Sequence, residues 1–436
     1  INNPLKLIVL IYNYCNIVIV IPFQLIMMKK AVAALLLLVS SLALASNPFK
    51  YGGYLDGDSD YGVKIFYWFF PAQNPDAPLI LWLQGGPGCT GAMAALAENG
   101  PYTVDDHLKL VENPGAWTQK YHMLYVDSPI GTGFSYSEKP MSDDVFRASI
   151  PENLFLALGD FRNKFKSFAD NDFYIFGESY AGKYIPQLSH YILQQKDTQI
   201  PLKGIGIGDG FSDPLSQSQS YADFGYQFGL LNANQRSAML LQQANVRKLI
   251  EGQKWMEALA EHTNVTYELL AFSGWPDPSD VRKYGFSSLN FTGVIDFMNL
   301  VSTRQALNVG NRSYSEICNS DVGQRMSIEQ MQSVKPLFAD ILSSIRVLEF
   351  NGNFDPTVPP AACEEFLLSI DWDGLDGYKS AKRQVWRYNG ETAGYVQAFK
   401  ALTHVTVVQA GHMATEDQPM RVFDMVDRFI EKRGWQ

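Results

Sequence analysis

The stretch Phe173-Tyr-Ile-Phe-Gly177-Glu-Ser179-Tyr-Ala181-Gly182 carries a serine at the junction between a strand and a helix. Residues 173–176 form a short apolar run typical of a buried strand, and a helix-compatible segment follows the serine. Gly177 and Ala181, the small residues on either side of Ser179, permit the strained turn that lifts a serine hydroxyl above a sheet edge. The stretch therefore predicts a nucleophile elbow, with Ala181 where a second glycine is usual.

Short apolar runs alternate with helical patterns along the rest of the chain. Several of these runs are apolar on both faces, as buried parallel strands are. They cover residues 63–70, 79–83, 123–126, 173–176, 204–207, 347–350 and 405–408. Residues 152–168 and 419–432 each place apolar side chains on one helical stripe. The alternation predicts an α/β fold of the α/β-hydrolase class, with a mostly parallel central sheet flanked by helices.

Residues 215–335 break this rhythm, because they are polar, rich in glutamine and helix-prone. We interpret them as a helical cap inserted into a core that comprises residues 46–214 and 336–436. The alternative is that this stretch is a continuation of the core whose strand pattern is poorly resolved in the sequence.

A catalytic serine needs a base, and His412 in the segment Val407-Val-Gln-Ala-Gly-His412-Met413 is the best candidate. It follows the last strand, where a loop residue can reach the edge of the sheet. His404 begins that strand and has a stronger structural interpretation. Asp355 also follows a predicted strand, and it completes the order Ser–Asp–His of this fold class. Asp355 would hold the imidazole in the correct tautomer.

The oxyanion of an acyl-transfer reaction needs two backbone donors. The amide of Tyr180, directly after Ser179, is one candidate. The segment Leu79-Ile-Leu-Trp82-Leu-Gln84-Gly85-Gly86-Pro87-Gly88-Cys89 offers the other, because its glycines let the backbone approach a substrate closely. We expect the second donor to be the amide of Gly86.

The N-terminal region resembles a targeting segment. Met27 and Met28 precede Lys29-Lys30, an apolar run follows, and Ala43-Leu-Ala45 provides a cleavage site of the A-x-A type. We expect the mature chain to begin near Ser46, and residues 1–26 to be a translated leader. A membrane span over residues 5–28 is the alternative, although its polar residues and proline weaken it.

Three glycosylation sequons begin at Asn264, Asn290 and Asn311, and all lie in the predicted cap. With a signal peptide they indicate a secretory protein, destined for a lysosome or vacuole or for the outside of the cell, without stable membrane association after cleavage. In an oxidising compartment, one disulfide is expected among Cys89, Cys318 and Cys363.

Composition and failed motifs exclude several functions. Hydrophobic residues make up 46% and charged residues 18% of the 436 positions, so the chain can bury a large core. The net charge of −10, without a basic run, argues against nucleic-acid binding. The segment Asp56-Gly-Asp58-Ser-Asp60 lacks the glycine and glutamate of a calcium loop. The glycine spacing at 204–208 is wrong for a dinucleotide site. We therefore expect no metal and no cofactor.

Several blocks together resemble the serine carboxypeptidase family over roughly residues 51–428. They are the segments 82–89 (Trp-Leu-Gln-Gly-Gly-Pro-Gly-Cys), 98–101 (Glu-Asn-Gly-Pro), 127–135 (Asp-Ser-Pro-Ile-Gly-Thr-Gly-Phe-Ser), 177–182, 390–395 and 410–413. The resemblance implies an α/β-hydrolase core with a helical insertion. It also implies removal of C-terminal residues, at acidic pH, from peptides that carry a free terminal carboxylate.

The resemblance also implies roles for individual residues. Trp82, Gln84 and Gly85 would face the terminal carboxylate of the substrate, Glu178 would bind it, Glu98 would support Glu178, and Met413 would also contact substrate. Cys89 would pair with Cys318, which leaves Cys363 as a buried free thiol. Gln84 stands where most members have asparagine, as in the vitellogenic-like and retinoid-inducible branch, and Asp209 replaces a usual asparagine.

Two carboxylates repel each other, so Glu178 must be protonated to donate a hydrogen bond to the substrate. This pairing predicts tighter substrate binding at acidic pH. An acyltransferase on the same scaffold and a protective or binding protein with incidental catalysis are the alternative functions. A homodimer is the oligomeric alternative to a monomer.

Overall fold

The computed structural model describes residues 7–10, 19–22, 48–196, 198–274, 276–284, 291–314 and 316–435. The chain forms two compact units, residues 1–50 and 51–436. In the first unit, β1 (Leu7–Leu10) pairs antiparallel with β2 (Ile19–Pro22). The predicted signal peptide and its cleavage site lie outside the described residues. Within those residues, no helix combines the length and apolar character that crossing a membrane requires.

A sheet of ten strands forms the centre of the second unit, in the order β14-β15-β16-β13-β10-β9-β5-β8-β4-β3. Parallel pairing joins the six central strands from β16 to β8, and antiparallel strands close both edges. The strands are β3 (Gly52–Asp56), β4 (Lys64–Phe70), β5 (Leu79–Leu83), β8 (His122–Val126), β9 (Phe173–Glu178), β10 (Leu202–Gly208), β13 (Arg346–Gly352), β14 (Gln384–Tyr388), β15 (Glu391–Phe399) and β16 (Leu402–Val407). The predicted fold class is confirmed.

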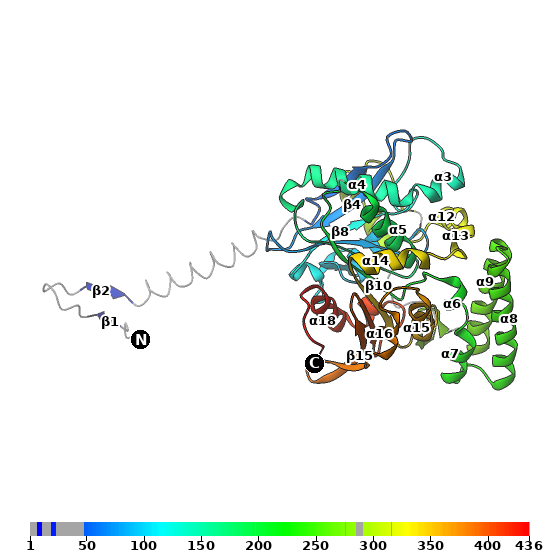
Figure 1. Cartoon of the computed structure of the whole chain (residues 1–436). Helices are drawn as coiled ribbons and strands as arrows, with labels where there is room; N and C mark the ends of the chain where they lie inside the picture. The colour runs from blue at the N-terminus through cyan, green and yellow to red at the C-terminus, as the bar shows by residue number, and fades with distance from the viewer. Residues whose placement is uncertain are drawn as a thin grey trace. The chain divides into compact units, whose positions relative to one another are not determined.

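Every residue of β5, β8 and β9 is buried, because helices cover both faces of the parallel sheet. On one face, Ile175 of β9 belongs to the main apolar core together with residues of α5 (Ala181–Gln194) and α14 (Phe338–Ser344). On the other face, Phe176 makes an edge contact with Phe429 of α18 (Pro419–Ile430). Figure 1 shows α4 (Ile150–Lys164), α5 and α14 together over the sheet.

A long insertion separates two neighbouring strands. β10 and β13 are parallel neighbours, yet residues 209–345 lie between them in sequence. The insertion contains α6 (Pro214–Gln217), α7 (Tyr221–Gln227), α8 (Ala233–Glu251), α9 (Trp255–Ser273), β11 (Pro276–Asp277), β12 (Asp280–Tyr284), α10 (Phe291–Asn299), α11 (Val301–Ala306), α12 (Ser320–Arg325) and α13 (Ser327–Gln330).

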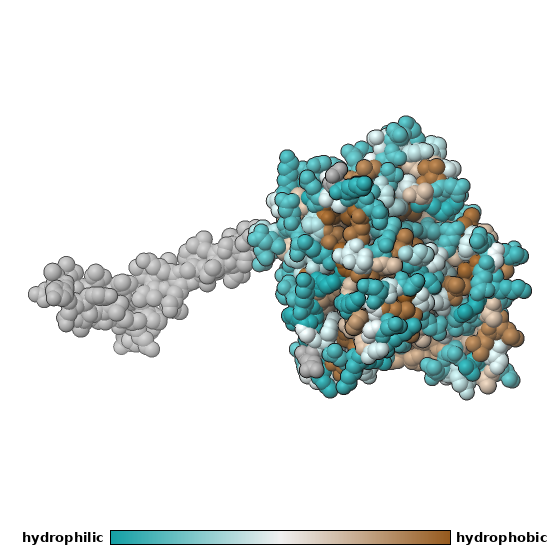
Figure 2. Space-filling model, in the orientation of Figure 1, coloured by the Kyte–Doolittle hydropathy of each residue, from teal (hydrophilic) through white to brown (hydrophobic). Residues whose placement is uncertain are grey.

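The helices α7, α8 and α9 share an apolar cluster of their own, which includes Tyr221, Met239, Val246 and Leu269. Figure 1 shows α8 and α9 side by side at one end of this unit. Figure 2 shows a mostly hydrophilic surface with separate apolar patches, one of them over this helix pair, where Leu241 is exposed. The division into core and cap at residues 215 and 335 stays a prediction.

Candidate active site

Ser179 lies in a sharp turn between β9 and α5, with a φ angle of +60°. Its N–H donates to the carbonyl of Gly208 at 2.9 Å, and its own carbonyl accepts from Gly182 and Phe211 at 2.9 and 3.0 Å. A Cβ atom on Gly177 would lie 2.1 Å from the Leu83 carbonyl oxygen, so only glycine fits there. The turn has the geometry of a nucleophile elbow.

Asp355 and His412 meet at the ends of β13 and β16. The Nδ1 atom of His412 lies 2.8 Å from Oδ2 of Asp355. The Oδ1 atom of Asp355 accepts from the amides of Thr357 and Val358 at 2.7 and 3.1 Å. Burial acts to lower the pKa of His412, but the charge of Asp355 and the hydrogen bond to it outweigh burial, and the pKa is raised.

The strand order brings Ser179 to the same sheet edge, because β9, β10, β13 and β16 are consecutive neighbours. The hydroxyl of Ser179 makes no hydrogen bond with His412 among the bonds described for these two residues. Such bonds are often long before substrate binds. The alternative base, His404, lies within β16, and burial lowers its pKa to about 4, which fits its structural interpretation.

The amides of Gly86 and Tyr180 border the serine. A Cβ atom on the adjacent Gly85 would lie 2.7 Å from both Ser179 Cβ and Tyr180 N, so the β5 loop touches the elbow. The backbone hydrogen bonds described for this part of the chain use neither the Gly86 nor the Tyr180 N–H. Both residues line a cavity of about 270 Å³ together with Ser179. Two unused donors beside a serine can hold an oxyanion.

Most of this cavity is lined by residues that carried no sequence signal. They come from α7, α9, α13 and the adjoining loops: Phe211, Tyr221, His262, Thr266, Leu269, Leu270, Pro278, Gln330, Met331, Pro356, Thr357 and Val358. The Tyr221 hydroxyl donates to the Thr357 carbonyl at 3.0 Å and lies 3.2 Å from Nε2 of His262. Residues 262, 266, 269 and 270 share one face of α9, but their spacing does not reveal what that face contacts.

The residues implied in carboxylate binding form one buried cluster. The indole N–H of Trp82 donates to Oε1 of Gln84 at 2.7 Å, and Nε2 of Gln84 donates to Oε1 of Glu178 at 2.8 Å. Thr415 donates to Glu98 at 2.5 Å, and Glu98 lies beside Glu178 in this cluster. None of these residues lines the cavity at Ser179, and Met413 is also buried outside it.

Burial dominates the electrostatics of this cluster. It raises the pKa of Glu98 to about 7. Burial and then the charge of Glu98 raise the pKa of Glu178 well above its usual range. Two buried carboxyl groups in contact favour a state in which they share a proton.

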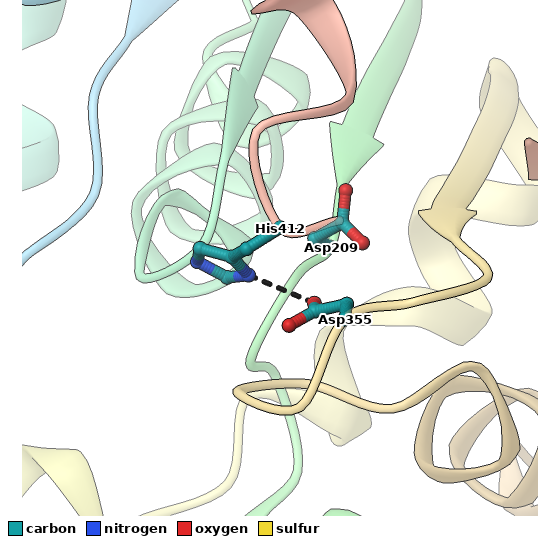
Figure 3. A group of neighbouring side chains, drawn as sticks. All are labelled: Asp209, Asp355 and His412. Atoms are coloured by element: carbon teal, nitrogen blue, oxygen red, sulfur yellow. Dashed lines mark hydrogen bonds and ion pairs between the residues drawn. The ribbon is translucent and has the colours of Figure 1, made fainter. Parts of the chain in front are cut away.

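Asp209 lies beside Asp355 and His412, and Figure 3 shows the three side chains gathered from the ends of three strands. One oxygen of each aspartate and one ring nitrogen of His412 lie within 4.8 Å of one another, a spacing that a metal ion could also bridge. The distance of 2.8 Å between His412 and Asp355 is that of a direct hydrogen bond, so these two atoms already satisfy each other.

The structure contains the disulfide that the resemblance implies, between Cys89 and Cys318. Cys363 is a free, buried thiol on α15 (Pro360–Ser369). Of the three sequon residues, Asn264 and Asn311 are exposed, and Asn290 lies outside the described residues.

Comparisons with known proteins show the family to which the chain belongs. A family model described as serine carboxypeptidase matches residues 44–432. The human probable serine carboxypeptidase CPVL is 36% identical over 408 residues, which cover 89% of this chain and 84% of the relative. The venom serine carboxypeptidase of Apis mellifera is 34% identical over 408 residues, covering 88% and 85% of the two chains. The crystal structure of KEX1(delta)p, a prohormone-processing carboxypeptidase from Saccharomyces cerevisiae, has a TM-score of 0.77 at 24% identity, covers 90% of this chain and 94% of its own, and supports the fold.

Proposed function

Because this chain belongs to the serine carboxypeptidase family, we propose that it releases single C-terminal residues from peptides by means of Ser179, His412 and Asp355. The observation that carries the proposal is the hydrogen bond between His412 and Asp355 at the sheet edge where the Ser179 elbow ends β9. A strained serine, an oriented imidazole and a buried carboxylate in this chain order are the parts of a hydrolase triad.

The reaction follows from these parts. His412 accepts the proton of Ser179 while the serine oxygen bonds to the last peptide carbonyl carbon. The amides of Gly86 and Tyr180 hold the oxyanion. His412 then passes the proton to the departing amino group, the C–N bond breaks, and an acyl-enzyme remains. Water, activated by His412, releases the shortened peptide and restores Ser179.

Selectivity for the chain terminus would come from the buried carboxyl cluster. A protonated Glu178 can donate to a substrate carboxylate, whereas an ionised one would repel it. Gln84 holds Glu178 through one amide hydrogen and keeps a second hydrogen for the substrate. Glu98 shares the proton with Glu178, so the pair stays protonated at acidic pH.

The cavity beside the serine would hold the side chain on the acyl side of the cut. It contains the two candidate oxyanion donors but none of the carboxylate-binding residues, so it lies toward the part of the peptide that is retained. Leu269, Leu270, Met331 and Phe211 make its wall largely apolar. We infer a preference for an apolar residue before the scissile bond.

The raised pKa values and the targeting segment point to one kind of destination. Carboxyl groups that must stay protonated work best in an acidic compartment. We therefore propose a route through the secretory pathway to a lysosome-like or vacuolar compartment, or to an acidic extracellular fluid.

The direct test is hydrolysis of N-blocked dipeptides from about pH 4 to about pH 8, with C-terminally amidated peptides as controls. Free acids should be cleaved best at acidic pH, and the amides up to ~10⁴-fold more slowly. A fluorophosphonate probe should label wild-type protein and not Ser179→Ala. Absence of labelling in folded wild-type protein would favour a binding role. Acyl transfer to added alcohols that outpaces hydrolysis would favour the acyltransferase.

A further inference from the structure

We propose that Asp209 keeps its proton in the working enzyme and donates it in a hydrogen bond to Asp355, and is thereby a positioning residue for His412. This inference rests on the proposed roles of Asp355 and His412. It adds a fourth side chain to the proposed catalytic arrangement, one that acts through Asp355 and does not touch the substrate.

The backbone holds Asp209 rigidly at this position. Asp209 directly follows β10 and has a φ angle of +46°. Its N–H donates to the Phe350 carbonyl at 2.7 Å, and its Oδ1 accepts from the Gly352 amide at 2.8 Å. The residue is completely buried. These contacts fix the carboxyl group against the strand that leads to Asp355.

The second carboxyl oxygen of Asp209 lacks an ordinary hydrogen-bond donor. Its Oδ2 is buried and has no donor among the described residues. The nearby Asp355 is also an acceptor, and one carboxyl oxygen of each aspartate lies within 4.8 Å of one on the other, so the two groups are placed to share a hydrogen bond. Two carboxyl oxygens can form such a bond only when one of them carries a proton.

The surroundings of the two aspartates decide where that proton lies. Asp355 accepts from three donors: the ring N–H of His412 and the amides of Thr357 and Val358. Hydrogen bonds to a carboxylate favour its ionised form. Asp209 accepts from the single amide of Gly352. Asp355 is therefore the anion, and Asp209 is the acid that donates to it.

The negative charges around Asp209 act in the same direction. Burial and then the charge of Asp355 raise its pKa well above the usual range, and the charge of Glu178 at the end of β9 adds to this. Glu349 of β13 and Cys363 of α15 lie in the adjoining core, and burial raises the pKa of both. His412, when protonated, is the cation of the group.

Ionisation of Asp209 at higher pH would put two negative charges side by side and remove the donor to Asp355. The imidazole would lose its fixed orientation, so the reactivity of Ser179 should fall on the alkaline side. An asparagine at position 209 still donates through its amide but cannot ionise. The Asp209→Asn variant should keep the reactivity of Ser179, and that reactivity should no longer fall at alkaline pH.

The rate of fluorophosphonate labelling at Ser179 tests this as a function of pH, because the probe has no C-terminal carboxylate and does not depend on Glu178. In the full chain, Asp209→Asn should label within about 3-fold of wild type at acidic pH and show no alkaline fall. Asp209→Ala, which lacks a donor, should label about 10- to 100-fold more slowly. Glu349→Gln, which removes another buried carboxyl, should keep the wild-type profile.

The outcomes separate this inference from the proposed function. Wild-type protein that labels at Ser179, with an alkaline fall unchanged in Asp209→Asn, overturns the role of Asp209 and leaves the hydrolase intact. An Asp209→Asn variant as slow as Asp209→Ala also overturns it. Failure of folded wild-type protein to label overturns the proposed function itself. If Asp209→Ala does not fold, the pH profile of Asp209→Asn alone decides.

Discussion

Glu178 lies one residue before Ser179, and its protonation state controls how a substrate carboxylate would be held. Burial and the charge of Glu98 raise its pKa. Its neutral form therefore predominates at acidic pH and is lost as pH rises. We predict that KM for a free-acid peptide increases with pH in the wild-type protein, and that Glu178→Gln removes most of that increase because glutamine cannot ionise. Steady-state kinetics over the same pH range measures this.

An N-blocked amino-acid ester serves as the matched control for Glu178, because it has no carboxylate to bind. Its KM should change little with pH in either protein. A rise of KM for the free acid that persists in Glu178→Gln would assign the pH dependence to another group and count against the proposed role.

Gly177 and Gly159 differ in the space that is available for a side chain, so alanine should have opposite effects at the two positions. Gly177→Ala would drive a methyl group to 2.1 Å from the Leu83 carbonyl oxygen, so β9 and β5 would have to separate beneath the elbow. We predict loss of fluorophosphonate labelling. We also predict that the free energy of unfolding falls by about 2 kcal/mol or more, as in overpacked cores. Thermal unfolding and labelling of the purified variant measure both effects.

Gly159→Ala is the control for that substitution. Gly159 lies inside α4, and a Cβ atom there would meet nothing within 4 Å. Alanine is favoured over glycine in a helix by about 1 kcal/mol, so this variant should be as stable as wild type or more so. If both variants are destabilised equally, the close approach of Gly177 to the Leu83 carbonyl is not the cause of the loss of stability.

At the scale of elements, α9 contributes four residues to the cavity wall and so should set the size of the accepted side chain. Thr266→Phe fills part of the 270 Å³ space beside the serine. We predict that kcat/KM falls by about 10-fold or more for a peptide with phenylalanine before the scissile bond and changes little for alanine there. A matched pair of N-blocked dipeptides measures this ratio.

Asn264→Gln tests whether the effect is specific to the cavity face. Asn264 is on the same helix but exposed, so its replacement should leave the ratio between the two peptides unchanged. If Thr266→Phe lowers kcat/KM equally for both peptides, the cavity does not hold the acyl-side residue.

The same elements show which features the sequence could reveal. The central strands are fully buried, so their continuous apolar runs predicted them within a few residues. The edge strand β14 was missed because four of its five residues are at least partly exposed, which leaves no apolar run. Motifs identified Ser179 and His412 because their chemistry requires fixed neighbours. The cavity face of α9 and the contact of Asp209 with Asp355 depend on tertiary placement, which local patterns do not encode.

At the scale of the whole molecule, buried carboxyl groups occur outside the proposed active site as well as within it. Burial raises the pKa of Asp127 to about 6 and that of Glu98 to about 7. It also raises the pKa of Glu178, Asp209 and Glu349 well above their usual range. Each group is neutral in the folded chain at a pH where it would be ionised in the unfolded chain.

These raised values link stability to pH with a definite sign. Between the unfolded pKa near 4 and the higher folded pKa, the folded state binds more protons, so the free energy of unfolding decreases as pH rises. A shift of one pKa unit corresponds to about 1.4 kcal/mol. The raised pKa of Asp127 alone should therefore lower the free energy of unfolding by an amount of the order of 3 kcal/mol as pH rises. We predict that the thermal midpoint is highest near pH 4, at the lower end of this window, and falls by about 5 °C or more by pH 8. Circular dichroism melts across this range measure it.

Glu349→Gln should flatten the decline of the thermal midpoint because it removes one such carboxyl group. Glu112→Gln, at an exposed position, should leave the decline unchanged. A midpoint that stays level or rises toward pH 8 would contradict a net stabilisation of the folded chain by these neutral carboxyl groups.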